Sequence, residues 1–402
     1  MADLLLLTIG TGTAGRTSNL LAGLRRAIEM SDPERFWLVP STDEISLLMA
    51  DEVRSGNAKF APWSETEPYH ALRAPDDLEA CRLHLRAMLA KLRALLRPGQ
   101  KLLVNATSGT KQMTAAAVLA ALDEGLGDLV FISGERADGV VKTGTERIVQ
   151  FDAARFFRER DLASARDLFA AGAFASAAKL LEPHRQALPL NHAMCRTLHH
   201  WRRLDYLKAE NAAGSWSEVH RRGLATRAQC AASRQPSLLI LSDILGWSER
   251  ACDIGEANES LALGYKALEW AARYALQVDL QLTAPRANGY FELDAVLALA
   301  RNSEEARRLQ ALARDGEVSL GLSRALQLLR SNGHPLGSGF FENKQIEKLT
   351  NRRNQAVHDI RPVEISEARQ LLDYARELVK VAGWDLEPLP IPAALPEEPG
   401  SP

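Results

Sequence analysis

The sequence predicts an α/β domain of the Rossmann-like type with a parallel sheet, followed by a wholly helical region that reaches almost to the carboxyl end. Two observations support this prediction. From residue 4 to about residue 150, short continuous apolar runs alternate with segments of helical periodicity. Such runs are typical of parallel strands that helices cover on both faces. After residue 151 these runs stop, and nearly every segment up to residue 384 has the periodicity of a helix.

The composition places the chain among soluble globular proteins. It has 402 residues, of which 46% are hydrophobic and 25% are charged, enough for two or three domains. The net charge of −2 gives no overall attraction for nucleic acid, although it leaves room for a local basic groove. No apolar run approaches the roughly 20 residues that cross a bilayer, and the first run lacks the basic flank of a signal peptide. We therefore expect a cytoplasmic protein that does not bind membranes.

The elements of the α/β domain are expected in a regular order. Apolar runs predict strands at 4–10, 35–41, 101–107 and 128–134, with 58–63 as a further candidate. Helical periodicity lies between them at 18–30, 43–53, 78–97 and 111–125. The pair Asp138 and Gly139 predicts the turn of an antiparallel hairpin near the end of this domain.

The remaining chain is divided by its breaks and its composition. We expect the α/β domain at 1–151, a helical linker domain at 152–235, a second helical domain at 236–386 and a disordered tail at 387–402. The tail is rich in proline and shows no pattern that would form a core. The four cysteines of the whole chain are far apart in the sequence, which indicates neither a zinc site nor a disulfide scaffold.

Two loops lie where an open parallel sheet binds its ligands, directly after strands. The first contains Gly10, Thr11, Gly12 and Thr13, and the second contains Asn105, Thr107, Ser108, Gly109, Thr110 and Lys111. Each leads into a helix, whose free backbone N–H groups and dipole favour an anion, and Lys111 adds a positive charge. The alternative is that both loops only form tight turns and helix caps. The glycines at 10, 12 and 15 do not complete a dinucleotide fingerprint, because no acidic residue closes the second strand.

The segments "TIGTGT" at 8–13 and "NATSGTKQM" at 105–113 resemble the paired signatures of CRISPR-associated Rossmann-fold (CARF) domains. This resemblance covers roughly the first 150 residues. It implies that both loops face a dimer axis and that the residues named above contact a cyclic oligoadenylate, the tetra-adenylate being favoured over the hexa-adenylate. Ser108 stands where many family members have glycine. The sequence fixes neither the ring size nor whether the domain degrades its own activator.

The stretch "EKLTNRRNQAVHDIRP" places Arg353 and His358 on one predicted helix with four residues between them. Histidine titrates near neutral pH and can transfer protons, while arginine stays charged and binds phosphate oxygens with two N–H groups. Asn354 could orient either partner. At this spacing the two side chains are about 140° apart around the helix, so we expect two copies facing each other to complete one site. The same residues would also fit a solvated helix face.

This spacing matches the R-x4-6-H signature of HEPN domains, and the segment 262–276 resembles an early helix of HEPN modules fused to CARF domains. Together the motifs make the chain similar to the CARF–HEPN ribonucleases of type III CRISPR systems. The resemblance implies a homodimeric, metal-independent endoribonuclease that cleaves single-stranded RNA, with Arg353, Asn354 and His358 as its catalytic residues, no cofactor and cyclic oligoadenylate as its activator. The base preference and any assembly beyond a dimer are not fixed by the sequence.

Other interpretations stay open or are weaker. A nucleotide-sensing regulator or scaffold without nuclease activity is the alternative function. His192, His199 and His200 lie close together but have no carboxylate at ligand spacing, so we expect no metal site there. The basic stretch 196–227 could guide RNA, or it could be a solvated helix face with interspersed acids.

Overall fold

The computed structural model describes residues 3–11, 17–126, 128–137, 140–141, 144–214, 216–233, 235–358 and 362–397. The side chains of residues 136, 137, 140, 152 and 353–358 are not part of this description. The chain forms two compact units, Met1–Glu159 and Arg160–Pro402. No helix among the described residues is long and apolar enough to cross a membrane.

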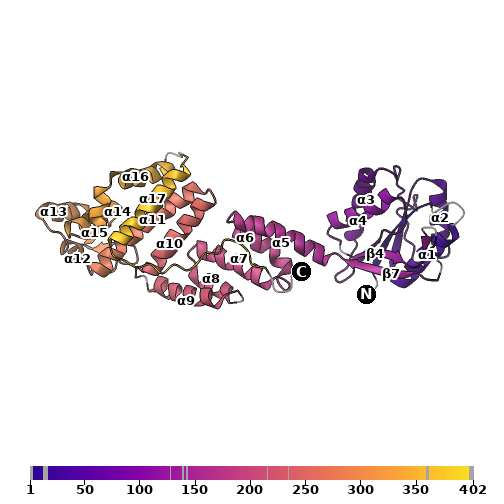
Figure 1. Ribbon diagram of the computed structural model, residues 1–402, viewed down its shortest axis with the longest axis horizontal. Coiled ribbons are helices and arrows are strands. Elements are labelled where there is room, and N and C mark those ends of the chain that lie inside the picture. Colours follow the sequence, from indigo (N-terminus) through magenta and orange to yellow (C-terminus); the bar gives the residue numbers. More distant parts are fainter. Residues whose placement is uncertain are drawn as a thin grey trace. The chain divides into compact units, whose positions relative to one another are not determined.

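A five-stranded sheet with the order β2-β1-β3-β4-β7 forms the centre of the first unit (Figure 1). The first four of these strands are parallel, and the last pairs antiparallel with its neighbour. The strands are β1 (Leu4–Ile9), β2 (Arg35–Pro40), β3 (Leu102–Asn105), β4 (Asp128–Ser133) and β7 (Arg147–Asp152). The predicted parallel α/β sheet is therefore confirmed, with an antiparallel strand at one edge.

Helices cover both faces of this sheet because the side chains of β1 alternate between two cores. Leu5 and Leu7 pack with α1 and α2, whereas Leu4 and Leu6 pack with α3 and α4 (Figure 1). The helices are α1 (Thr17–Ser31), α2 (Glu44–Arg54), α3 (Leu78–Arg93) and α4 (Lys111–Asp123). Since both faces are buried, the strands read as continuous apolar runs.

Two local predictions need correction or refinement. The segment 58–63 is not a strand of the sheet, because only Phe60 forms a bridge, to Phe36. Pro62 has no N–H group to donate to a ladder, which shortens the pairing. The predicted hairpin is present as β5 (Arg136–Ala137) and β6 (Val140–Val141), which pair antiparallel, while Asp138 and Gly139 at its turn lie outside the described residues.

The second unit is helical, as predicted. It begins within α5 (Ala154–Ala170) and contains one short antiparallel ribbon, β8 (Phe291–Glu292) with β9 (Glu317–Val318). Its further helices are α6 (Phe174–Leu181), α7 (Pro189–Arg202), α8 (Tyr206–Ala213), α9 (Glu218–Ala232), α10 (Leu238–Asp253), α11 (Ala257–Tyr274), α12 (Leu293–Leu297), α13 (Ser303–Leu312), α14 (Leu322–Ser331), α15 (Pro335–Glu342), α16 (Lys344–His358) and α17 (Ile365–Val381), with the short helices η1 (Glu182–His184) and η2 (Ala275–Asp279).

One hydrophobic core runs through this unit from Leu162 to Leu395. The expected boundary at residue 235 is therefore not marked by a break in the packing, and a separate linker domain stays a prediction. A buried ion pair joins the two sides of that boundary, since Arg227 of α9 donates to Asp243 of α10 at 2.8 Å. The indole N–H of Trp201 donates to the same carboxylate at 2.8 Å.

The proline-rich segment 385–397 packs against helices, which contradicts the expectation of a disordered tail beginning at residue 387. Leu389 lies against Gly223 of α9, and Leu395 is buried in the core of the second unit. The carbonyl oxygen of Pro390 lies 2.9 Å from His220 Nε2. Composition failed here because an extended segment without a periodic pattern can still bury single apolar side chains on a surface that other elements supply.

Candidate functional site

The two predicted ligand loops meet at the carboxyl edge of the sheet. Because β1 and β3 are neighbours in parallel register, the segments that follow them emerge side by side. The backbone N–H of Gly10 donates to Ser108 Oγ at 2.9 Å, and the hydroxyl of Thr8 donates to the carbonyl oxygen of Ser108. The structure thus brings the two loops into contact. Gly12 and Thr13 lie outside the described residues.

Two glycines make this approach possible. A Cβ atom on Gly10 would lie 2.7 Å from both the Cα and the N atom of Gly109. Gly109 has φ +125°, a conformation that side chains rarely adopt. Both positions therefore require glycine for a backbone reason, independent of any ligand. Ser108 replaces the glycine of many CARF proteins. Its hydroxyl oxygen accepts the hydrogen bond from the N–H of Gly10 in the facing loop.

The remaining polar side chains of the second loop are largely occupied within the protein. Thr107 Oγ1 accepts from the N–H of Ile132 at 2.8 Å. Thr110 caps α4 by accepting from the N–H of Met113 at 3.2 Å. Asn105 is fully buried and accepts from the N–H of Thr107, and its Nδ2 has no hydrogen-bond partner among the described residues.

Lys111 is the exposed member of the second loop, in the first turn of α4. Ser108 is buried to all but 4% of its surface, and Asn105 is completely buried. These two therefore support the loop from inside the protein, whereas Lys111 is exposed. The helix dipole and this ammonium group both favour an anion at this edge.

The candidate catalytic residues lie on α16, but the side chains of Arg353, Asn354 and His358 are outside the described residues. The preceding turns of α16 are well anchored, since Ile346 and Leu349 are buried. Helix α16 therefore has a fixed position in the second unit up to the residue before the motif.

Arg352, in the last two turns of α16, contacts residues at and just before the start of α17. Its Nε lies 3.2 Å from the Glu367 carboxylate, and its Nη2 donates to the carbonyl oxygen of Pro362 at 2.9 Å. Glu367 also belongs to the capping box that opens α17, together with Glu364. These contacts join α16, at the residue before the motif, to the start of α17.

A polar cleft of about 560 Å³ lies beside the same stretch of α16. Lys344, Lys348 and Arg352 line it at intervals of four residues, and Glu367 and Gln370 come from α17. Residues four apart share one helix face, so the cleft follows the helix toward the motif. The sequence analysis missed this row of basic residues, although its spacing was visible in the sequence.

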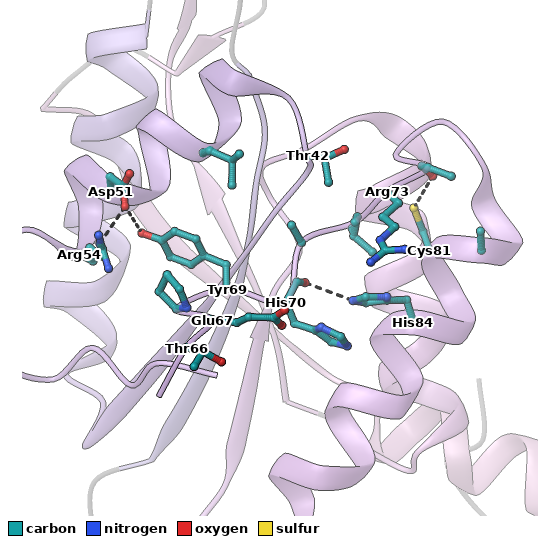
Figure 2. Close-up of a pocket in the computed structure, with 16 residues that line it drawn as sticks. Thr42, Asp51, Arg54, Thr66, Glu67, Tyr69, His70, Arg73, Cys81 and His84 are labelled. Carbon is teal, nitrogen blue, oxygen red and sulfur yellow. Dashed lines mark hydrogen bonds and ion pairs between the residues drawn. The ribbon is translucent and has the colours of Figure 1, made fainter. Parts of the chain in front are cut away.

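A larger cavity of about 800 Å³ lies in the first unit between α2, α3 and the segment 66–74 (Figure 2). The rings of His70 and His84 lie there with centroids 4.2 Å apart, and Trp63 stacks on His70 with ring centroids 5.1 Å apart. Burial lowers the pKa of both histidines. Tyr69 donates to Asp51 at 2.8 Å, and burial together with this bond raises the pKa of its phenol. No residue of the two predicted loops lines this cavity.

Several arginines of the basic stretch 196–227 form ion pairs with acidic side chains. Arg227 is buried against Asp243, Arg202 pairs with Glu259, and Glu218 binds both Arg221 and Arg222. Most of the basic side chains in the stretch 196–227 therefore have acidic partners. Among the described residues, no group of three or more His, Cys, Asp or Glu side chains could hold a metal ion.

Comparisons with known proteins agree with this arrangement. Residues 229–382 match the family model of the Csm6 HEPN domain. Among solved structures, Enterococcus italicus Csm6 bound to cyclic hexa-2'-fluoro-hexa-dAMP is similar, with a TM-score of 0.60 and 13% identity over 95% of this chain and 94% of that chain. Comparison with curated proteins finds no match. At this identity the structural likeness concerns the fold. The chain therefore has a Csm6-like fold along its length, and its residues 229–382 are similar to the Csm6 HEPN domain.

Proposed function

We propose that this protein is a metal-independent endoribonuclease that cleaves single-stranded RNA when a cyclic oligoadenylate binds its first domain. One observation supports this most strongly. The Arg353–His358 motif lies on α16, inside the region 229–382 that matches the Csm6 HEPN domain. The first domain supplies an anion-favouring loop pair on a chain with the Csm6 fold.

The proposed reaction needs only the groups of the motif. The 2′-hydroxyl of the RNA attacks the adjacent phosphorus, and the bond to the 5′-oxygen breaks, which leaves a 2′,3′-cyclic phosphate and a 5′-hydroxyl end. His358 transfers the proton, since an imidazole can act as base or acid near neutral pH. Arg353 stabilises the charge that develops on the phosphate oxygens, and Asn354 orients the arginine or the phosphate.

We further propose that the active form is a homodimer. Five residues along a helix turn the side chain by about 140°, so one copy of α16 does not direct Arg353 and His358 at one phosphate. Two copies related by a twofold axis would place the histidine of one beside the arginine of the other.

The activator is proposed to bind the edge formed by Gly10, Thr11 and Gly109 through backbone groups and Lys111, with Gly12 and Thr13 completing the first loop. The similar Enterococcus italicus structure holds a cyclic hexa-adenylate analogue. The tetra-adenylate favoured above is therefore to be tested against the hexa-adenylate, by titrating both rings into one RNA cleavage assay.

The nuclease assignment is tested with purified protein, a cyclic oligoadenylate and labelled RNA. We expect cleavage to persist in EDTA and the His358→Ala variant to lose at least about 100-fold in rate, as for loss of a general acid or base. His199→Ala, on α7, is the matched control and should keep full activity. Equal rates for wild type and His358→Ala would refute the assignment and favour a sensing protein without nuclease activity.

A further inference from the structure

The second unit contains a small pocket with an arginine that has no acidic partner. Arg273 of α11 lines it, and its Nε is buried without a hydrogen-bond partner among the described residues. Burial lowers the pKa of this guanidinium, and no nearby carboxylate opposes that shift. Buried donors in proteins are nearly always bonded, so an unpaired one calls for an explanation.

Other arginines of this unit show what a structural role would require. Arg376 binds both oxygens of Glu249, at 3.0 and 2.7 Å. Arg286 pairs with Glu292 at 2.9 Å and with Glu317 at 2.6 Å. In the Arg273 pocket the single acid, Glu269, is already paired with Lys266 at 3.2 Å. Among the described residues that line the pocket, Arg273 is therefore the cation without an acidic partner.

The walls of the pocket are apolar and aromatic. Leu276, Phe291 and Leu322 line it and are almost completely buried. The guanidinium carbon of Arg273 lies 5.9 Å from the ring centroid of Trp270, whose own N–H donates to the carbonyl oxygen of Ser237 at 2.9 Å. That hydrogen bond fixes the indole, and the indole in turn supports the guanidinium by a cation–π contact.

The volume limits what can enter. The pocket holds about 140 Å³, below the roughly 300–1,000 Å³ of sites that enclose a whole small molecule. It fits a single anionic group, with the rest of the ligand lying outside along the aromatic rim.

We propose that the Arg273 pocket binds one phosphodiester group of single-stranded RNA. A phosphodiester carries one negative charge, which matches the single free cation, and its two non-bridging oxygens fit the paired N–H groups of a guanidinium. Trp270 offers the flat surface on which unpaired bases stack in single-strand binding proteins. None of the described residues lining the pocket belongs to α16, so this is a strand-holding site apart from the proposed catalytic motif. The inference rests on the proposed function in so far as it takes RNA as the ligand.

The test measures binding of a 2′-O-methyl RNA oligonucleotide, which lacks the attacking hydroxyl and cannot be cleaved. Fluorescence anisotropy should show about tenfold weaker binding for Arg273→Gln, since a charge-assisted hydrogen-bond pair is lost. The slope of log affinity against log salt should fall by about 0.7, the value for one phosphate contact on a single strand. Arg307→Gln, which removes an exposed arginine of α13, is the matched control and should bind as wild type does.

Two further arms make the result specific. Methylphosphonate linkages, which carry no charge, should abolish the difference between wild type and Arg273→Gln. Arg273→Lys, which keeps the charge but loses the paired N–H groups, should bind with intermediate affinity. The melting temperature of Arg273→Gln should be no lower than that of wild type, because the replaced charge has no acidic partner among the described residues.

Equal affinities of wild type and Arg273→Gln for the charged strand would overturn the inference, and so would an absence of binding by wild type. A strong loss of melting temperature in Arg273→Gln would also overturn it, by showing a structural role. If binding depends on Arg273 but ordinary RNA is never cleaved, the nuclease proposal fails while the strand-holding site stands.

Discussion

At the scale of single residues, the first domain separates side chains that build the loops from those that can meet a ligand. Ser108 and Asn105 were both expected to contact the activator, yet both are buried and bond to backbone groups of the loops. Gly10 and Gly109 are required by the distance between two backbones. Lys111 is exposed, so its replacement should weaken the binding of an anion without disturbing the loop.

The paired histidines of the first unit predict a dependence of stability on pH. Burial lowers the pKa of His84 and of His70 below the ordinary value of 6.5, so the unfolded chain binds protons more readily. Above pH 6.5 these histidines should therefore leave the free energy of unfolding unchanged. Below pH 6.5 the free energy of unfolding should fall as the pH drops. Lys91 and Arg73 add to this effect by repelling a charged His70, while Glu67 opposes it.

The measurement is the melting temperature between pH 5 and 8 for wild type and for the His70→Gln, His84→Gln double variant. The variant should lose less stability than wild type between pH 6.5 and pH 5. Leu83→Gln, an exposed position on the same helix, should keep the wild-type profile. Parallel curves for wild type and the double variant would contradict this prediction. They would show that the two imidazoles bind protons equally well in the folded and in the unfolded chain.

At the scale of elements, α16 and α17 form the frame of the candidate catalytic segment. Arg352 holds the end of α16 against Glu367 at the start of α17, and Glu367 closes the capping box of that helix. The candidate motif Arg353–His358 follows Arg352 directly within α16. A catalytic motif placed there can be positioned by two rigid helices, which is the arrangement that precise chemistry requires.

The segment 385–397 is the element for which the structure makes the clearest stability prediction. A chain ending at Leu386 would lose Leu395 from the core and would remove the Glu387 carbonyl oxygen that accepts from Arg227 at 2.9 Å. Burial of one leucine side chain alone contributes about 1.5–3 kcal/mol, so we expect a loss of at least about 2 kcal/mol.

Urea unfolding of the truncated and full-length chains would measure this loss. A chain ending at Pro396, which keeps Leu389 and Leu395, is the control and should match full-length protein. A truncation at Leu386 with unchanged stability would restore the view of the tail as a disordered extension.

At the scale of the whole molecule, the proposed activation requires that ligand binding at one unit favour an active arrangement of the other. A ligand can do this only if it binds the two states with different affinity. Among the described residues, one hydrophobic core extends from α5 to α17, so the packing of the second unit shows no break between α5 and α16. Such continuous packing is a suitable route for coupling, which the activator titration can examine.

Lys111→Ala should raise the activator concentration needed for half-maximal RNA cleavage by about tenfold, because one charge-assisted contact is lost. The maximal rate at saturating activator should stay unchanged, since the catalytic motif is in the other unit. Arg35→Ala, at the amino end of β2 and thus at the opposite edge of the sheet, is the control. An unaltered activation curve for Lys111→Ala would place the activator elsewhere.

The sequence by itself determined the class of each unit and the position of both motifs. Continuous apolar runs and helical periodicity are local properties, so the sheet strands and the helices could be predicted from them. The Arg353–His358 spacing and the two loops are likewise short sequence features. The hidden structural roles of Ser108 and Asn105 could not be predicted, because they depend on a facing loop about a hundred residues away, as in the Gly10–Ser108 bond.

Only the tertiary structure decided which distant parts meet. Strand order places β1 beside β3 and so joins the two loops, and this order follows from long-range pairing rather than from any local pattern. The packing of segment 385–397 has this origin, and so does the lack of a partner for Arg273 Nε among the described residues. The burial of a side chain and the pairing of a charge depend on residues that are distant in the sequence. A short stretch of neighbouring residues therefore cannot predict them.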